Sequence, residues 1–289
     1  MRILVVVGFC LLASASATVL QSYHDAVGIP LATQIKEIED AAASSFSGAR
    51  SDNKIVGGAV APVNTHPYLA GLVIYLLNTS NISACGASLL SATRLVTAAH
   101  CWFDGQRQAW LFEVVLGSQM LFQGGTRINT NSVVMHPQWT PSLLWNDVAM
   151  IYLPTIAIQP IALPAVNDLS QNFVGLWAVA AGYGKTTQVG VSSNTVISHV
   201  NVQVISVDEC ARVYNQVWPY VQSFTICTSG VGGVGICGGD SGGPLVIHRN
   251  GVPTLVGISS FAANNACQNS HPSGFARVTS FYSFIMQHM

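Results

Sequence analysis

Short runs of β-favouring residues alternate with turn residues from position 55 to the end of this chain. Valine, isoleucine, leucine and threonine fill the runs, and glycine, proline, asparagine and serine separate them. The clearest candidate strands are residues 69–77, 88–96, 113–116, 148–153, 176–181, 196–204, 244–247 and 254–259. Many short strands with few helical periods predict an all-β fold, built as barrels or as a sandwich.

Two short helices are predicted inside this β-rich part. Ser206 followed by Glu209 has the pattern of a capping box, which predicts a helix beginning there. Near the C-terminus, Thr279 or Ser280 is expected to cap a second helix. That helix would place four side chains on one face: Phe281, Phe284, Ile285 and His288.

Residues 1–17 have the pattern of a secretory signal peptide. Arg2 precedes an apolar run at 3–12, and residues 15–17 (Ala-Ser-Ala) offer a small-residue cleavage site. The apolar run is too short to cross a bilayer, and no later stretch is long and apolar enough. We therefore expect a mature protein that is secreted, extracellular and not bound to membranes.

Residues 18–54 differ in composition from the rest. They hold five acidic and three basic residues, and Ile35, Ile38 and Ala42 follow helical spacing. They contain no cysteine, so no disulfide could hold them after a cut. We interpret them as an activation propeptide that departs after cleavage. The alternative is a disordered tail without an inhibitory role.

Charge is scarce in this chain. Charged residues make up 8% of it, against roughly 25% in average domains. From Ile55 onward seven basic residues balance seven acidic ones, and Lys185 is the only lysine. No basic patch can therefore form for nucleic acid or for an anionic membrane.

Three short segments supply a serine, a histidine and an aspartate in patterns that suit nucleophilic catalysis. Ser241 lies in the segment GGDSGGP at 238–244, where glycines allow a tight bend. A serine hydroxyl is a weak nucleophile unless a base takes its proton. His100, in the segment TAAHC, could be that base. Asp147, in the segment NDVAM, could fix its tautomer and stabilise the imidazolium.

These segments, together with IVGG at 55–58, stand where the chymotrypsin family of serine endopeptidases carries its triad and its activated N-terminus. The chain resembles that family over residues 55–289, and its composition resembles insect digestive chymotrypsins. The resemblance implies two antiparallel six-stranded β-barrels, with a boundary near residues 160–175, a short C-terminal helix and the active site between the barrels. His100 and Asp147 would come from the first barrel and Ser241 from the second.

The resemblance also implies how the enzyme is activated. A trypsin-like protease would cut between Lys54 and Ile55, and the new ammonium group of Ile55 would pair with the carboxylate of Asp240. That pairing would order the surrounding loops. The N–H groups of Gly239 and Ser241 would then form the oxyanion hole.

Seven cysteines are present, and six remain once Cys10 leaves with the signal peptide. An even set in an oxidising compartment indicates disulfides, and no CxxC spacing favours zinc. Of the fifteen possible pairings, the family resemblance selects three: Cys85–Cys101, Cys210–Cys227 and Cys237–Cys267.

The specificity pocket is implied by the same resemblance. Gly235 lies six residues before Ser241, where trypsin-like members have an acid, so a cationic side chain would find no counter-charge. The other implied substrate-binding residues are Ser260, Phe261, Ala262 and Ser273. We expect cleavage after large apolar residues (Phe, Tyr, Leu, Met). An elastase-like preference for small ones is the alternative, because Ala262 and Ser273 stand where many chymotrypsins have glycine.

The remaining expectations concern ligands and partners. Asn78 and Asn81 begin glycosylation sequons, of which at most one would be occupied. No cofactor or metal is expected, since the loop at 117–135 has no carboxylate for calcium. The expected partners are protein and peptide substrates, the activating protease and protein protease inhibitors. We expect a monomer with a digestive role, plausibly in a gut lumen. The alternative from another functional class is a binding protein, a protease homologue without catalytic activity.

Overall fold

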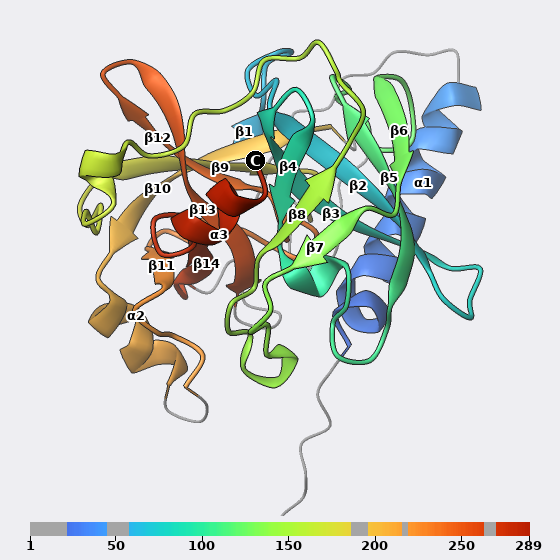
Figure 1. Cartoon of the computed structure of the whole chain (residues 1–289). Helices are drawn as coiled ribbons and strands as arrows, with labels where there is room; N and C mark the ends of the chain where they lie inside the picture. The colour runs from blue at the N-terminus through green and yellow to red at the C-terminus, as the bar shows by residue number, and fades with distance from the viewer. Residues whose placement is uncertain (1–21, 45–57, 186–195, 216–218, 263–269) are drawn as a thin grey trace, which may run out of the picture.

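The computed structural model describes residues 22–44, 58–185, 196–215, 219–262 and 270–289. The strands form two antiparallel sheets that lie side by side (Figure 1). The first sheet has the order β6-β5-β2-β3-β4-β8-β7. Its strands are β2 (Leu69–Leu76), β3 (Ile82–Ser91), β4 (Arg94–Thr97), β5 (Ala109–Leu116), β6 (Thr126–Thr130), β7 (Val133–Met135) and β8 (Ala149–Tyr152). The edge strands β6 and β7 are neighbours along the chain, so this sheet curls back on itself.

The second sheet has the order β1-β10-β11-β14-β13-β12-β9. Its strands are β1 (Ala59–Val60), β9 (Trp177–Gly182), β10 (Ser198–Ile205), β11 (Thr225–Thr228), β12 (Pro244–Arg249), β13 (Val252–Ala262) and β14 (Ser273–Arg277). Because β10 pairs with both β9 and β11, six strands close into a barrel and β1 adds to its outside. The predicted all-β, two-barrel fold is confirmed, with the first barrel a curled sheet.

Strand β10 shows why these residues form a barrel wall. Val200, Val202 and Val204 point into the core, while Asn201 and Gln203 between them are exposed. This period of two is the signature of a strand with one buried face. The valines pack with Ile226 and Phe275 in the core of the second barrel.

Several boundaries differ from the sequence-based expectation. The run at 88–96 is not one strand but the end of β3, a turn and most of β4. Strands β1, β6, β7, β11 and β14 were not predicted, since they are short or mostly polar. The chain passes from the first sheet to the second between β8 and β9.

The two predicted helices are present. α2 (Val207–Tyr214) begins where expected, and the Ser206 hydroxyl accepts a hydrogen bond from the Glu209 N–H at 3.1 Å. α3 (Tyr282–Gln287) buries Phe284 and Ile285, but Phe281 is at its N-cap without a side-chain cap, so the prediction of Thr279 or Ser280 as the cap is wrong. Single 3₁₀ turns are η2 (Ala99–Cys101), η3 (Pro141–Leu143) and η4 (Val166–Asp168).

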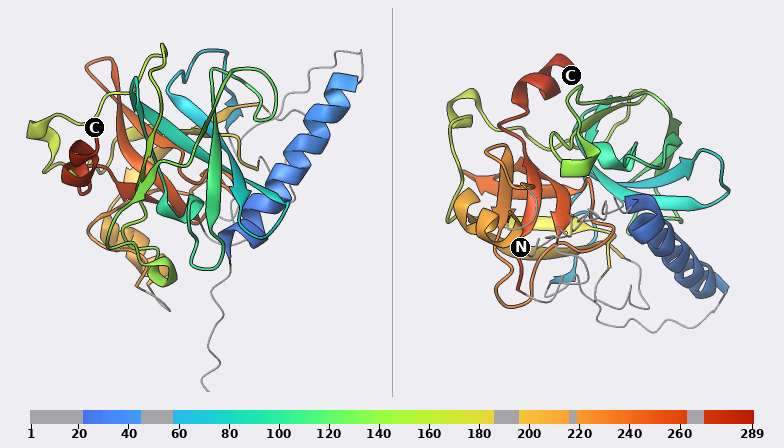
Figure 2. Two further views of the ribbon diagram at one scale, coloured as in Figure 1. Left: turned by 45° about the vertical axis from the view of Figure 1, so that its right-hand side comes forward. Right: turned by 90° about the horizontal axis from the view of Figure 1, so that it is seen from below.

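A helical segment precedes the barrels. The π-turn η1 (His24–Gly28) continues directly into α1 (Ile29–Ser44), which lies along the outside of the first sheet (Figures 1 and 2). Leu31, Ala32 and Ile35 of α1 are buried against that sheet. The helical spacing noted in the sequence at 35–42 therefore belongs to a docked helix.

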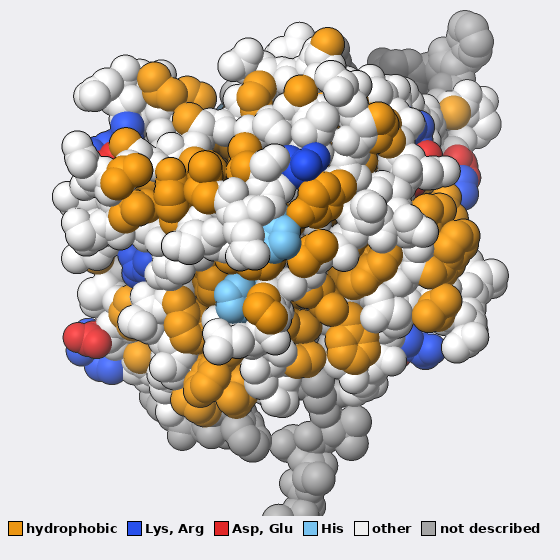
Figure 3. Space-filling model, in the orientation of Figure 1, with side chains coloured by type: hydrophobic (Ala, Val, Ile, Leu, Met, Phe, Trp, Pro, Cys, Tyr) orange, Lys and Arg blue, Asp and Glu red, His pale blue; other side chains and the backbone are white. Residues whose placement is uncertain are grey.

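The surface matches the scarcity of charge in the sequence. On the face in Figure 3, Lys, Arg, Asp and Glu side chains are few and scattered among polar and apolar ones. Within the described part of the chain, no helix is both long enough and apolar enough to span a bilayer.

Candidate active site

His100 and Asp147 meet because β4 and β8 are paired. His100 lies in η2, just after β4, and Asp147 lies just before β8; the pair Thr97–Ala149 closes the ladder beside them. The Nδ1 atom of His100 is 2.7 Å from Oδ2 of Asp147, and the backbone N–H of His100 donates to Oδ1 at 2.9 Å. Both side chains are buried. Nδ1 thus faces a carboxylate and Nε2 is left for other chemistry.

A third hydrogen bond reaches Asp147 from the second barrel. The Ser260 hydroxyl, on β13, donates to Oδ2 of Asp147 at 2.6 Å. Ser260 was predicted only as a substrate-binding residue, because nothing in its local sequence connects it to an aspartate 113 positions away. The carboxylate is therefore satisfied from both barrels, which lowers the cost of burying it.

The Ser241 loop is bonded to both sheets. The Ser241 carbonyl accepts from the Gly86 N–H on β3 at 2.7 Å, and the Gly242 N–H donates to the Ser259 carbonyl on β13 at 2.7 Å. Gly242 has φ +78°, and a Cβ there would lie 2.3 Å from the Gly86 carbonyl oxygen. Glycine is required at this position for both reasons.

Gly242→Ala should therefore strongly reduce activity, and Gly251→Ala is its matched control. Gly251 also has a positive φ, at +81°, but its Cβ would meet nothing within 4 Å. Each substitution strains the backbone by about 1–2 kcal/mol, and only Gly242→Ala also pushes the loop off β3. We expect at least about a hundredfold loss of kcat/KM for Gly242→Ala and near-native activity for Gly251→Ala. Equal activity in the two variants would contradict the proposed constraint.

The sequence matches the trypsin family over residues 55–285. This chain belongs to the trypsin family of chymotrypsin-like serine proteases. Relatives of this protease include a collagenase from Hypoderma lineatum, 33% identical over 82% of this chain and 87% of its own length. Brachyurin from Leptuca pugilator is 34% identical over 80% of this chain and 96% of its own length. A chymotrypsin from Phaedon cochleariae is 32% identical over 81% of this chain and 82% of its own length.

The fold of the protease has a close counterpart among solved structures. The structure of HL collagenase superposes with a TM-score of 0.73 at 33% identity, covering 81% of this chain and 98% of that one. Sequence and fold therefore agree on a serine protease that acts on protein substrates.

The protease keeps Asp240 buried beside Ser241. Its carboxylate accepts hydrogen bonds from the Gly184 N–H at 3.0 Å and the Cys237 N–H at 2.9 Å. Burial raises the pKa of Asp240 to about 6, against these two hydrogen bonds, which lower it. Among the described residues it has no cationic partner. Lys54 and Ile55, which the activation scheme requires, lie outside the described residues.

The raised pKa predicts a pH dependence for the uncut precursor. Above pH 6 the folded state must hold an ionised Asp240 that the unfolded state solvates freely, and below about 4 this penalty vanishes. Precursor stability should thus fall by up to about 3 kcal/mol between pH 4 and 7 on account of this group, at about 1.36 kcal/mol per pKa unit. Urea unfolding of the precursor and of Asp240→Asn measures the difference. Parallel pH curves for the two proteins would mean that Asp240 already has a counter-charge.

The predicted pocket residues are also brought together. Gly235 has φ +155°, and a Cβ there would lie 2.7 Å from the Ser273 hydroxyl. Ala262, at the end of β13, pairs with Ser273 on β14. The Phe261 ring covers Gly274 and packs at 5.1 Å from the Tyr214 ring. Ser273 is thus the side chain nearest to the position that trypsin-like members fill with an acid.

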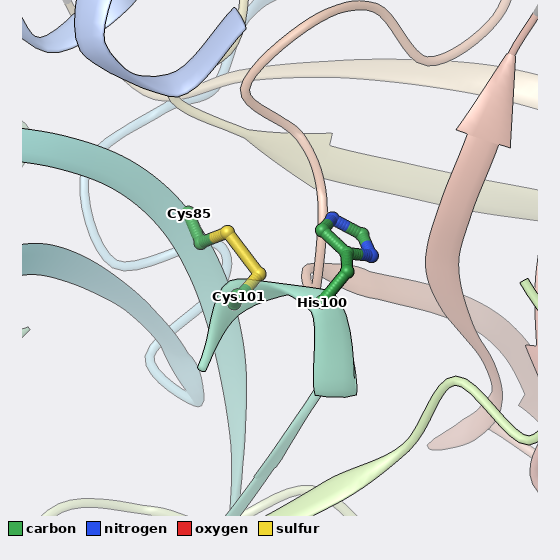
Figure 4. Close-up of side chains that lie close together, drawn as sticks. All are labelled: Cys85, His100 and Cys101. Carbon is green, nitrogen blue, oxygen red and sulfur yellow. A yellow bond between two sulfur atoms is a disulfide. The ribbon is translucent and has the colours of Figure 1, made fainter. Parts of the chain in front are cut away.

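Two of the three expected disulfides lie wholly within the described residues. Cys85–Cys101 joins β3 to η2 beside His100, and Cys210–Cys227 joins α2 to β11. Cys237 is also disulfide-bonded, and its expected partner Cys267 lies outside the described residues. His100 and the first pair lie close together (Figure 4), but the two sulfurs are bonded to each other and are not free to bind a metal. The sequon residues Asn78 and Asn81 are exposed in the turn between β2 and β3.

Proposed function

We propose that this protease is a secreted zymogen whose mature form cleaves peptide bonds after large apolar residues, with Ser241, His100 and Asp147 as its catalytic residues. The observation that carries the proposal is the set of hydrogen bonds on Asp147, from His100 and Ser260. These bonds fix the imidazole, and Nε2 makes no competing hydrogen bond among the described residues.

Each residue then has one task. Ser241 Oγ attacks the scissile carbonyl carbon while its proton moves to Nε2 of His100. The N–H groups of Gly239 and Ser241 stabilise the oxyanion. His100 returns the proton to the leaving amine, and an acyl-enzyme remains. Water then attacks the ester with His100 again as base, releasing the acid and restoring Ser241.

Labelling of Ser241 by an organophosphate tests this assignment. The reagent phosphorylates a serine only where a base activates it, so the activated protease should gain one phosphoryl group, located at Ser241 by peptide mass spectrometry. His100→Ala should prevent the labelling. A protein that is cut after Lys54, separated from its N-terminal segment and folded, yet is not labelled, would be a non-catalytic homologue.

The finer features of the function have separate support. The apolar preference rests on Gly235, and the elastase-like alternative rests on Ala262 and Ser273, which narrow the same pocket. Secretion rests on the signal-peptide pattern of residues 1–17. An activating trypsin-like protease is inferred from the basic residue Lys54 before Ile55. The digestive role rests on the likeness to relatives that include a collagenase and a chymotrypsin. A monomer and protein inhibitors as partners are what the family resemblance implies.

A further inference from the structure

We propose that residues 22–44 are a removable inhibitor that docks in the active site, and that a cut after Lys54 does not by itself displace them. The inference rests on the proposed function, because it needs His100 and Ser241 to be the groups that substrate must reach. The inhibitor is a segment of the same chain, and it contacts the rest of the protein at three places.

The first contact is made by Tyr23 at the catalytic side chains. Its ring centre lies 4.5 Å from that of His100, and the neighbouring Ser241 side chain acts to lower the pKa of Tyr23. The Tyr23 hydroxyl donates to the Ala84 carbonyl at 2.8 Å. Burial raises the pKa of Tyr23, so it stays a neutral donor. Nε2 of His100 is buried without a hydrogen-bond partner among the described residues, and the Tyr23 ring packs against the imidazole that a substrate would have to reach.

The second contact covers the backbone that would form the oxyanion hole. A Cβ on Gly239 would lie 1.9 Å from Cδ2 of Leu31, and one on Gly238 would lie 2.8 Å from Cγ1 of Val27. Leu31 is fully buried. These side chains therefore occupy the space beside Gly238 and Gly239, on the loop that a substrate carbonyl would have to approach.

The third contact is a pair of polar anchors at the two ends of the segment. At the start, the Ser22 hydroxyl and the His24 N–H donate to Oδ2 of Asp104 at 2.6 and 3.0 Å. Near the other end, Glu39 is 0% exposed and accepts from the Leu121 N–H at 2.8 Å and the Phe122 N–H at 2.9 Å. A buried carboxylate is costly unless such donors meet it, so Glu39 fixes one register of the helix.

Between the anchors the segment is an amphipathic helix in an apolar groove. Leu31, Ala32 and Ile35 pack on side chains of β2, β5 and the following loop: Leu69, Val73, Val115 and Leu121. The opposite face is exposed and carries Lys36, Glu37 and Asp40. This arrangement matches the helix-in-groove mode of peptide recognition.

The way the segment is tethered decides what cleavage does. In the intact chain a short covalent tether gives the segment an effective concentration on the order of millimolar. Residues 18–54 contain no cysteine, so the cut at Lys54 turns the contact into a reversible, bimolecular one. A helix of this length is marginal in water, so the released segment should dissociate on dilution. Activation thus has two steps, and the second depends on concentration.

The experiment compares precursors that differ in one carboxylate. All carry Lys36→Gln and Arg50→Gln, so that the activating trypsin leaves the segment intact and cuts at Lys54. Glu39→Gln removes the buried anchor, and Glu37→Gln makes the same charge change two positions away on the exposed face. After cleavage, specific activity on a Phe substrate is measured over a dilution series. In parallel, Ser241→Ala versions are passed over a size-exclusion column to see whether the segment co-elutes.

The parent carries only Lys36→Gln and Arg50→Gln. We expect its specific activity to rise on dilution, and the activity of Glu37→Gln should rise over the same range of enzyme concentration. Glu39→Gln should bind the segment about ten- to hundredfold more weakly, the loss of affinity expected when hydrogen bonds to a charged group are removed. It should therefore reach full activity at an enzyme concentration that is higher by the same factor. Specific activity that is full and independent of dilution in all three proteins, with no co-elution, would overturn the inference. A different result would be that the segment co-elutes with every protein except Glu39→Gln, while none of the proteins is active. That result would support the docking of the segment and refute the proposed function.

Discussion

Peptide substrates with Phe, Tyr or Leu before the scissile bond should be hydrolysed about a thousandfold faster, in kcat/KM, than matched Arg or Lys substrates. A cationic side chain that reaches Gly235 would meet the Ser273 hydroxyl there, where trypsin-like members of the family have an acid. An unpaired buried charge costs several kcal/mol, and about 4 kcal/mol corresponds to a factor near a thousand. Steady-state kinetics on a substrate series, with the segment 22–44 removed by gel filtration, measures the ratio.

A double variant provides the control for this preference. Gly235→Asp alone would be strained, because of the φ of +155° and the closeness of the Ser273 hydroxyl. Combined with Ser273→Gly, the new carboxylate should move the preference toward Arg and Lys. Comparable rates for Arg and Phe in the parent enzyme would show that Gly235 is not at the pocket floor. Faster cleavage after Ala and Val would establish the elastase-like alternative.

Activity should appear only when the chain is cut after Lys54. The ammonium group of Ile55 exists only after that cut, and Asp240 is buried without a cationic partner among the described residues. Pairing of the two charges would remove the penalty that raises the pKa of Asp240. Lys54→Gln should therefore remain about a hundred- to a thousandfold less active after trypsin treatment, since an unformed oxyanion hole costs about 2.7–4 kcal/mol.

The site of the cut is checked by sequencing the N-terminus of the active form. It should begin at Ile55, and a form cut only after Arg50 should stay inactive because four residues still precede Ile55. An active form that begins at Ser51 would contradict the ion-pair mechanism. The side chain of Ile55 can stay unchanged in this test, because the test depends only on the position of the new amine.

The proposed catalytic residues could be singled out in the sequence because each lies in a short, distinctive segment, and the order of these segments in the chain matches one family. The core of β10 was predictable for a related reason, since alternation is a local property. By contrast, the run at 88–96 contains no glycine or proline, so nothing marks the turn between β3 and β4. The polar strand β6 is held by its pairing with β5, which no local pattern reveals.

The contacts of the segment 22–44 could not be predicted for the same physical reason. Its apolar spacing indicated a helix, but an apolar stripe does not say which surface will bury it. Glu39 is one of five acids in residues 18–54, and the N–H groups that it binds are 82 and 83 residues away. Tyr23 stands outside the helical pattern, and only the fold brings it to His100.

The double attachment of the Ser241 loop makes catalysis sensitive to the alignment of the two barrels. Gly86 on one sheet and Ser259 on the other hold adjacent residues of the same loop. A small shear between the barrels must therefore break one of these bonds before either core is disturbed. Loss of catalysis on heating should accordingly precede the loss of β-structure seen by circular dichroism. Substitutions that shift one barrel would be tolerated only with compensating changes in the other. Residues of the two barrels that set their relative position should therefore change together in evolution.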